Sequence, residues 1–269
     1  MPICIENFLD EELSKLFTYD NIIAKLNENN NWGNVMKING QEVKSGKIGS
    51  FYGLADDHGS LPYFRCPSFD EAFGLTEWMK LLLDTINTKL NSKSNLIKIQ
   101  HYINGKSGIG SHSDKTLDMN PNENIIIFRI NKDTDKTRCI IFKEKDQNNI
   151  NETVYEMKSN SILIITPDEN KRMVHYVPIN ESDATDECIS FVFRSIGTFI
   201  NPINKIKYGI GAKYNTWEER IAHMEEKPIE QKNINELIVS MYHYENTTDL
   251  SKTDNIDQSY FDSVKNLTV

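Results

Sequence analysis

The stretch LIKIQHYI at residues 96–103 opens the part of the chain that decides the fold, because this apolar run has the length of one β-strand. Further short apolar runs follow it, and turn residues such as Asn104 and Gly105 separate them. They span residues 125–130, 139–143, 153–157, 162–166, 173–177 and 188–195. Many short strands without helices between them predict a β-sandwich or a jelly-roll barrel.

Helices are expected before this β-rich region. Asp10 is a candidate N-cap, and apolar residues at helical spacing predict one or two short helices up to about residue 29. Residues 32–66 are punctuated by glycine and rich in aromatic residues, which predicts two or three short strands with long loops. Ser68 begins a capping-box pattern, which predicts a helix from there through Leu90.

The chain after Gly197 becomes polar again and is expected to form a helical extension. Helical patterns occur near residues 216–226 and 233–244. From about Thr247 the sequence is rich in Asp, Ser, Asn and Thr, which predicts a loosely held tail.

Composition limits the class of protein. The 269 residues include 30 Lys and Arg against 39 Asp and Glu, and a net charge of −9 excludes a strongly basic protein that coats DNA. The sequence contains neither an apolar run long enough for a membrane helix nor a signal peptide pattern. Four scattered cysteines argue against a zinc ribbon and a disulfide framework. We therefore expect an intracellular protein, cytoplasmic or nuclear, with free thiols.

Three residues have the chemistry of a metal site. In a strand, His112 and Asp114 would point to the same face, because residues two apart share a face. A second histidine, His175, lies in the predicted strand at residues 173–177. Two histidines and one carboxylate on one face of a metal leave three positions open, which is typical of non-haem Fe(II) oxygenases.

Arg194 adds to this pattern. It ends the apolar run at residues 188–195, where strand alternation could direct it inward. A buried arginine is costly unless an anion pairs with it, and guanidinium binds carboxylate through two parallel hydrogen bonds. Arg194 is therefore a candidate ligand for a carboxylate co-substrate.

The ordered set of motifs from about residue 32 to 198 resembles the AlkB-like Fe(II)/2-oxoglutarate dioxygenases. The motifs are Gln100-His101-Tyr102, His112-Ser113-Asp114, His175-Tyr176-Val177-Pro178, and Ser190 to Arg194, with Phe51-Tyr52-Gly53 and residues 62–69 upstream. The resemblance implies an α+β fold with a double-stranded β-helix (jelly-roll) core, N-terminal flanking helices and a C-terminal helical extension. It implies a dioxygenase domain at residues 1–200, with a lid region at about 32–67 and the jelly-roll at about 95–198. Residues 201–269 then form the extension.

The resemblance also implies roles for individual residues. His112, Asp114 and His175 would hold Fe(II), and the residues that bind 2-oxoglutarate would be Gln100, Tyr102, Ser190 and Arg194. O₂ would convert this co-substrate to succinate and CO₂ while a substrate C–H bond is hydroxylated. If the hydroxylated carbon is an N-methyl group, formaldehyde leaves and the net result is demethylation.

The chain departs from the family at the closing strand. Cys188 stands where the family has its first arginine, so the residue for the distal carboxylate of 2-oxoglutarate is open. Arg194, Arg138 and Lys143 are the candidates.

Three functions remain open at this point. The first is oxidative demethylation of alkylated bases in nucleic acid that is single-stranded or has its base flipped out, with Phe51, Tyr52, Lys47 and Arg65 as candidate contacts. The second is hydroxylation of a protein side chain or a small molecule. The third is a noncatalytic barrel that binds a metal or ligand. The sequence does not specify an oligomeric state.

Overall fold

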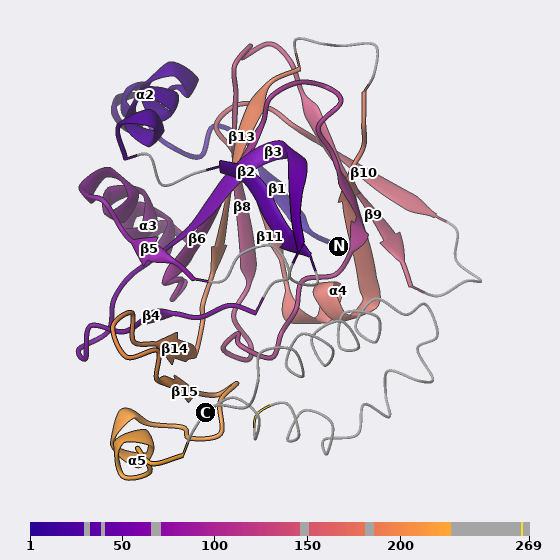
Figure 1. Cartoon of the computed structure of the whole chain (residues 1–269). Coiled ribbons are helices and arrows are strands. Elements are labelled where there is room, and N and C mark those ends of the chain that lie inside the picture. Colours follow the sequence, from indigo (N-terminus) through magenta and orange to yellow (C-terminus); the bar gives the residue numbers. More distant parts are fainter. Residues whose placement is uncertain are drawn as a thin grey trace.

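The computed structural model describes residues 1–29, 33–38, 41–65, 71–145, 151–180, 186–226 and 265. It has an α+β architecture rich in strands, in which two sheets face each other and two helices cover the outer side of the larger sheet (Figure 1). The strand-rich class expected from the sequence is confirmed, and the arrangement is compatible with a β-sandwich.

The larger sheet has eight strands. Its path is β1 (Ile3–Ile5), β11 (Ser161–Ile165), β8 (Ile125–Asn131), β13 (Cys188–Arg194), β6 (Leu96–Tyr102), β3 (Gln41–Gly53) and β2 (Gly33–Ile38), while β5 (Phe73–Gly74) pairs with β3. Within it, β13 lies between β6 and β8, and Ser190 is in register with Gln100 on one side and Arg129 on the other.

The smaller sheet has four strands in the order β10 (Glu152–Met157), β9 (Arg138–Glu144), β12 (Met173–Val177) and β7 (Ile109–His112). Each of the seven strand segments predicted between residues 96 and 195 is present within one or two residues of its expected bounds. The strand β7 was not predicted, because its sequence IGSH carries almost no apolar pattern.

Alternation along the strands divides the interior into two layers. On β6, Ile97 and Ile99 pack on the outer side against α2 (Tyr19–Asn29) and α3 (Glu77–Leu90). Leu96 and Tyr102 of the same strand join an inner cluster between the two sheets. Residues of one strand therefore serve two different environments, as a period of two requires.

The helix predicted to start at Ser68 starts later. Residues 66–70 lie outside the described part of the chain, and α3 begins at Glu77 with Thr76 as N-cap. Before it, Phe73 and Gly74 pair in parallel with β3, and a backbone engaged in a sheet cannot continue as a helix. The expected helix is therefore real but shorter at its N-terminal end.

The predicted N-cap at Asp10 is confirmed, and the predicted lid region has more strand structure than expected. Asp10 caps α1 (Glu11–Leu16) by accepting a hydrogen bond from the backbone of Leu13, as expected. The predicted lid at residues 32–67 is largely strand, because β2 and β3 belong to the larger sheet.

A third, three-stranded sheet connects β4 (Leu61–Pro62), β14 (Thr198–Ile200) and β15 (Lys207–Gly209). The helix expected near residues 216–226 is the short α5 (Trp217–Ile221). The helix expected at 233–244 and the polar tail lie outside the described residues. None of the helices in the described ranges combines the length and the apolar composition needed to cross a bilayer.

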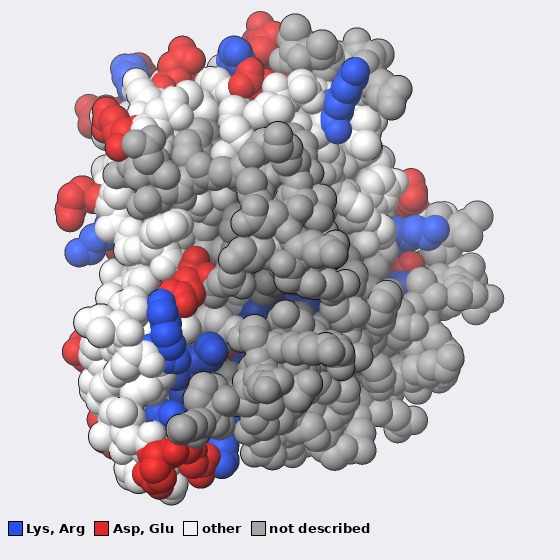
Figure 2. All heavy atoms as spheres, in the orientation of Figure 1, with Lys and Arg blue, Asp and Glu red and all other residues white. Residues whose placement is uncertain are grey.

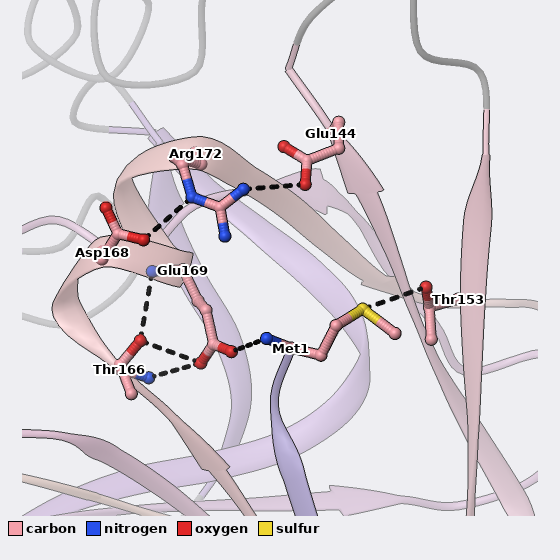
Figure 3. Close-up of polar contacts among 7 residues, drawn as sticks. All are labelled: Met1, Glu144, Thr153, Thr166, Asp168, Glu169 and Arg172. Atoms are coloured by element: carbon pink, nitrogen blue, oxygen red, sulfur yellow. Dashed lines mark hydrogen bonds and ion pairs between the residues drawn. The ribbon is translucent and has the colours of Figure 1, made fainter.

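A short helix between β11 and β12, α4 (Pro167–Arg172), was not predicted. A capping box between Thr166 and Glu169 starts it. Figure 3 shows that the Met1 amino group also contacts Glu169, at 2.5 Å, while Arg172 pairs with Asp168 and Glu144 at 2.9 Å each. These contacts fix α4 between β1 and the smaller sheet, directly before the strand that carries His175.

Candidate metal centre

Three residues converge at one end of the smaller sheet. His112 ends β7, Asp114 follows two residues later, and His175 lies on β12 directly opposite His112 in the register of the two strands. One ligand atom from each of the three lies within 4.8 Å of the others, so the group could hold a metal ion. Asp114 lies two residues beyond His112, just outside the strand, and its carboxylate is 3.7 Å from Nε2 of His112.

The hydrogen bond of His112 determines which nitrogen faces the site. Its Nδ1 lies 2.9 Å from the carbonyl oxygen of Gly110, which can only accept a hydrogen bond. Nδ1 therefore carries the proton, and Nε2 is the nitrogen with a lone pair in the neutral ring. Nε2 is also the atom nearest to Asp114, so His112 presents a ligand atom to the site.

His175 is held in its neutral form. Burial lowers the pKa of His175 to about 3, and the neighbouring His112 adds to this effect. The His175 ring stacks on Phe142, with ring centroids 5.3 Å apart, and lies 4.4 Å from the ring of His112. A neutral imidazole is the form that binds a metal.

Asp114 stays ionised although it is buried. Burial alone would raise its pKa, but Arg194 and the two histidines outweigh this effect and hold the pKa well below its usual range. Arg194 donates from Nε and Nη2 to Oδ2 of Asp114 at 3.1 and 2.5 Å. The other carboxylate oxygen, Oδ1, faces His112. Arg194 therefore orients the carboxylate.

The backbone of Asp114 is fixed from α4. The side chain of Asn170 accepts a hydrogen bond from the Asp114 amide and donates one to the Asp114 carbonyl, both at 2.8 Å. The hydroxyl of Ser113 donates to the carbonyl of Met173 at 2.7 Å. Asn170 is a positioning residue that the sequence reasoning missed, because α4 itself was not predicted.

A pocket between the two sheets includes this group. It is lined by residues that alternate along β6, β8 and β13, together with residues of the smaller sheet: Lys98, Gln100, Tyr102, Ile109, His112, Asp114, Ile127, Arg129, Ile140, His175, Val177, Ser190, Val192 and Arg194. Gln100, Tyr102, Ser190 and Arg194, which the sequence singled out for a co-substrate, all lie in this lining.

Arg129 is the most informative residue that the sequence reasoning missed. It is fully buried on β8 and lines the pocket opposite Ser190. Its sequence context is an arginine within an apolar strand, IIIFRIN, which is the same signal that identified Arg194. The argument from a buried arginine in an apolar strand, applied to β8 as well as to β13, would have identified both Arg129 and Arg194.

The alternative candidates for the co-substrate carboxylate lie elsewhere. Arg138 pairs with Asp186 at 3.0 Å and donates to the backbone carbonyls of Asn104 and Ser107. It packs against the ring of Tyr102 but is not among the residues that line the pocket. Lys143 is exposed on β9. Neither is placed to meet a ligand in the pocket.

Of the candidate substrate contacts, some lie near the pocket and others do not. Phe51 is on the inner side, against Phe64 and the amine of Lys98. Tyr52 points to the opposite side of β3 and is buried against α3, so it packs in the core as a structural residue. Lys47 lies on β3, but its side chain is outside the described part of the chain.

Arg65 also differs from its expected role as a phosphate contact. It is 3% exposed, and its guanidinium binds the carboxylate of Asp118 and the carbonyl oxygen of Gly211. The structure therefore removes Arg65 from the candidate nucleic-acid contacts.

Basic side chains gather on one surface, over β14 and β15, next to acidic side chains near α5 (Figure 2). Lys205 pairs with Glu71 at 2.6 Å, and Lys213 pairs with Glu226 at 2.5 Å. This surface is therefore of mixed sign rather than a continuous basic stripe, and it offers limited support for a nucleic-acid interface.

The chemistry of the pocket fits a metal and an anion together. The donor set is two imidazoles and one carboxylate. Four buried polar atoms of the lining find no hydrogen-bond partner among the described residues: Ser190 Oγ, Arg194 Nη1, and Nε and Nη2 of Arg129. Buried donors of this kind are costly unless something occupies them. The arrangement can thus place a carboxylate ligand beside a metal ion.

No protein-family model matches the chain, and no curated protein matches it at a significant level.

Proposed function

We propose that the chain is an Fe(II)- and 2-oxoglutarate-dependent dioxygenase with a jelly-roll core of the AlkB-like kind. Along the chain, β6, β8, β11 and β13 enter the larger sheet, while β7, β9, β10 and β12 enter the smaller one. This alternation between facing sheets supports the jelly-roll topology.

The observation that carries the proposal is the convergence of His112, Asp114 and His175 in a pocket that also presents two buried arginines. Three guanidinium nitrogens of these two arginines find no hydrogen-bond partner among the described residues, and a bound anion would supply one. A centre with open metal positions and a dicarboxylate co-substrate needs both features.

The residues of the chain would divide the work as follows. His112 and His175 would supply imidazole nitrogens, and Asp114 would supply the carboxylate that Arg194 orients. Gln100, Tyr102 and Ser190 line the space where hydrogen bonds to the co-substrate would form. Iron, when bound, would supply the oxidation: O₂ and 2-oxoglutarate give succinate and CO₂, and one oxygen atom enters a substrate C–H bond.

For the substrate, we propose an N-alkylated nucleic-acid base that is oxidatively demethylated. Phe51 and Phe64 pack against each other beside the pocket residues Lys98 and Arg194, although both rings are largely buried. This aromatic pair is the candidate stacking surface for a flipped base. The net charge of −9 and the internal pairing of Arg65 favour the second candidate, hydroxylation of a protein side chain or small molecule.

The test is succinate formation in anaerobically reconstituted protein given Fe(II), 2-oxoglutarate and then O₂. We expect iron-dependent succinate from the wild type and none from His175→Ala, whereas His223→Ala, a change to an exposed histidine of the C-terminal region, should retain it. Absence of succinate from folded, iron-loaded wild type would favour a noncatalytic barrel.

Formaldehyde then separates the two enzymatic candidates. Release of formaldehyde from methylated oligonucleotides supports base demethylation. Succinate formation that responds only to peptides or small molecules supports the second candidate.

A further inference from the structure

Arg129 is a buried cation that has no counterion among the described residues. The residue is 0% exposed, and no carboxylate of the described residues forms an ion pair with it. Its contacts are the sulfur of Cys188, 3.3 Å from Nη1, and the ring of Tyr102, 5.7 Å from the guanidinium carbon. Nε and Nη2 have no hydrogen-bond partner within the described ranges. Neither contact neutralises the charge.

Three other buried arginines of the described residues each have a carboxylate partner. Arg65 pairs with Asp118 at 2.7 Å, and Arg138 pairs with Asp186 at 3.0 Å. Arg194 pairs with Asp114. An unpaired, desolvated charge is strongly unfavourable, so a protein that retains one at this depth has an anion to place against it.

The position of Arg129 shows which end of the pocket it marks. Arg129 is in register with Ser190, which lies four residues before Arg194 on β13. Four residues of strand span about 13 Å between Cα atoms, a distance that two long side chains can shorten by leaning towards one another. Arg194 marks the metal end because it binds Asp114. Arg129 therefore marks the far end of the same pocket, and both residues line it.

We infer that Arg129 binds the distal carboxylate of a five-carbon 2-oxo dicarboxylate whose 2-oxo acid end faces the metal group, with Ser190 as a neighbouring hydroxyl donor. This inference rests on the proposed function. Cys188 is uncharged and cannot bind that carboxylate itself, but it lies against Arg129, so the guanidinium from β8 occupies the space beside it. The role of the distal anchor thus passes from the closing strand to the neighbouring strand.

The inference predicts a selectivity. The compound 2-oxopentanoate keeps the 2-oxo acid end of 2-oxoglutarate and carries a methyl group in place of the distal carboxylate. Arg129 should favour 2-oxoglutarate because only that ligand supplies the missing counterion.

The experiment is equilibrium binding of both ligands to the Mn(II)-loaded full-length protein by calorimetry, without O₂. The wild type should bind 2-oxoglutarate more tightly than 2-oxopentanoate. Arg129→Gln should lose roughly 30-fold or more in affinity for 2-oxoglutarate, and the preference should disappear. Arg129→Lys keeps a charge but not the fork of donors, and should retain part of the preference.

Arg220→Gln is the matched control. Arg220 is a 3% exposed arginine of α5 that donates to the carbonyls of His223 and Glu226 and does not line the pocket. This variant should keep the wild-type preference. Folding of every variant is checked by thermal unfolding and by Mn(II) binding, and Arg129→Lys replaces Arg129→Gln if the latter does not fold.

The outcomes separate the two claims. If the wild type binds Mn(II) but not 2-oxoglutarate, the proposed function fails. If the wild type binds and prefers 2-oxoglutarate while folded Arg129 variants keep the same affinity and preference, the role of Arg129 is overturned and the proposed function stands.

Discussion

The two faces of the eight-stranded sheet are built from the same strands but differ in chemistry. The outer face packs Ile97, Ile99 and Phe191 against the helices, and these side chains are fully buried. The inner face places Ser190 and Arg129 in the pocket, with polar atoms that have no partner among the described residues. One face therefore supplies stability, and the other gives up stability for binding.

The outer face should show the largest effect on stability. Phe191→Ala removes a fully buried ring that contacts Trp78 and Phe128, so the free energy of unfolding should fall by about 3–5 kcal/mol. Denaturant unfolding measures it. Val154→Ala, at a residue 53% exposed on β10, is the control and should change stability little. Equal losses at the two positions would contradict the contrast between the core and the surface.

A paired buried arginine should also matter for stability. Arg65→Met leaves Asp118 buried without its cation, and the free energy of unfolding should fall by about 3–5 kcal/mol. Lys213→Met removes a more exposed ion pair and should have little effect. A stable Arg65→Met protein would show that this pair does not hold β4 and its neighbours in place.

Within the metal centre, Asn170→Ala should weaken metal binding about 10–100-fold while the three ligand residues remain. The change removes two hydrogen bonds that fix the backbone of Asp114. Calorimetric titration with Mn(II) measures the effect. Asp168→Ala, on the solvent side of the same helix, should bind as the wild type does. Unaltered affinity in Asn170→Ala would remove its positioning role.

The smallest effect has the opposite sign. Arg129→Met replaces an unpaired buried charge by an apolar side chain, so the ligand-free protein should gain about 1 kcal/mol of stability. Thermal unfolding without 2-oxoglutarate measures it. A destabilised variant would mean that Arg129 has a favourable partner in the protein itself. That result would contradict an open anion site at Arg129.

The sequence predicted the strands well, because most are short apolar runs bounded by turn residues, and strands of the larger sheet such as β8 and β13 are buried on both faces. It also contained the inner face: polar residues recur with a period of two at Lys98, Gln100 and Tyr102, and again at Ser190. These polar residues interrupt the apolar pattern on the side facing the pocket, which is the physical reason that the site was detectable.

The parts of the site that depend on contacts between residues far apart in the sequence could not be predicted. Nothing near Arg65 in the sequence indicates that Asp118 will pair with it, and adjacent aromatic residues such as Phe51 and Tyr52 necessarily face opposite sides of a strand. The helix α4 is too short for a periodic pattern, and its capping-box signal at Thr166 and Glu169 was not used, so Asn170 was missed. Arg129 was within reach of the same reasoning that selected Arg194.

The central claim is that His112, Asp114 and His175 hold one divalent metal ion together. Its most direct test is a calorimetric titration of the metal-free protein with Mn(II) or, without O₂, Fe(II). The account predicts one ion per chain in the wild type and loss of that binding in His112→Ala, Asp114→Ala and His175→Ala, each still folded. Stoichiometric, equally tight binding in folded His175→Ala would contradict it.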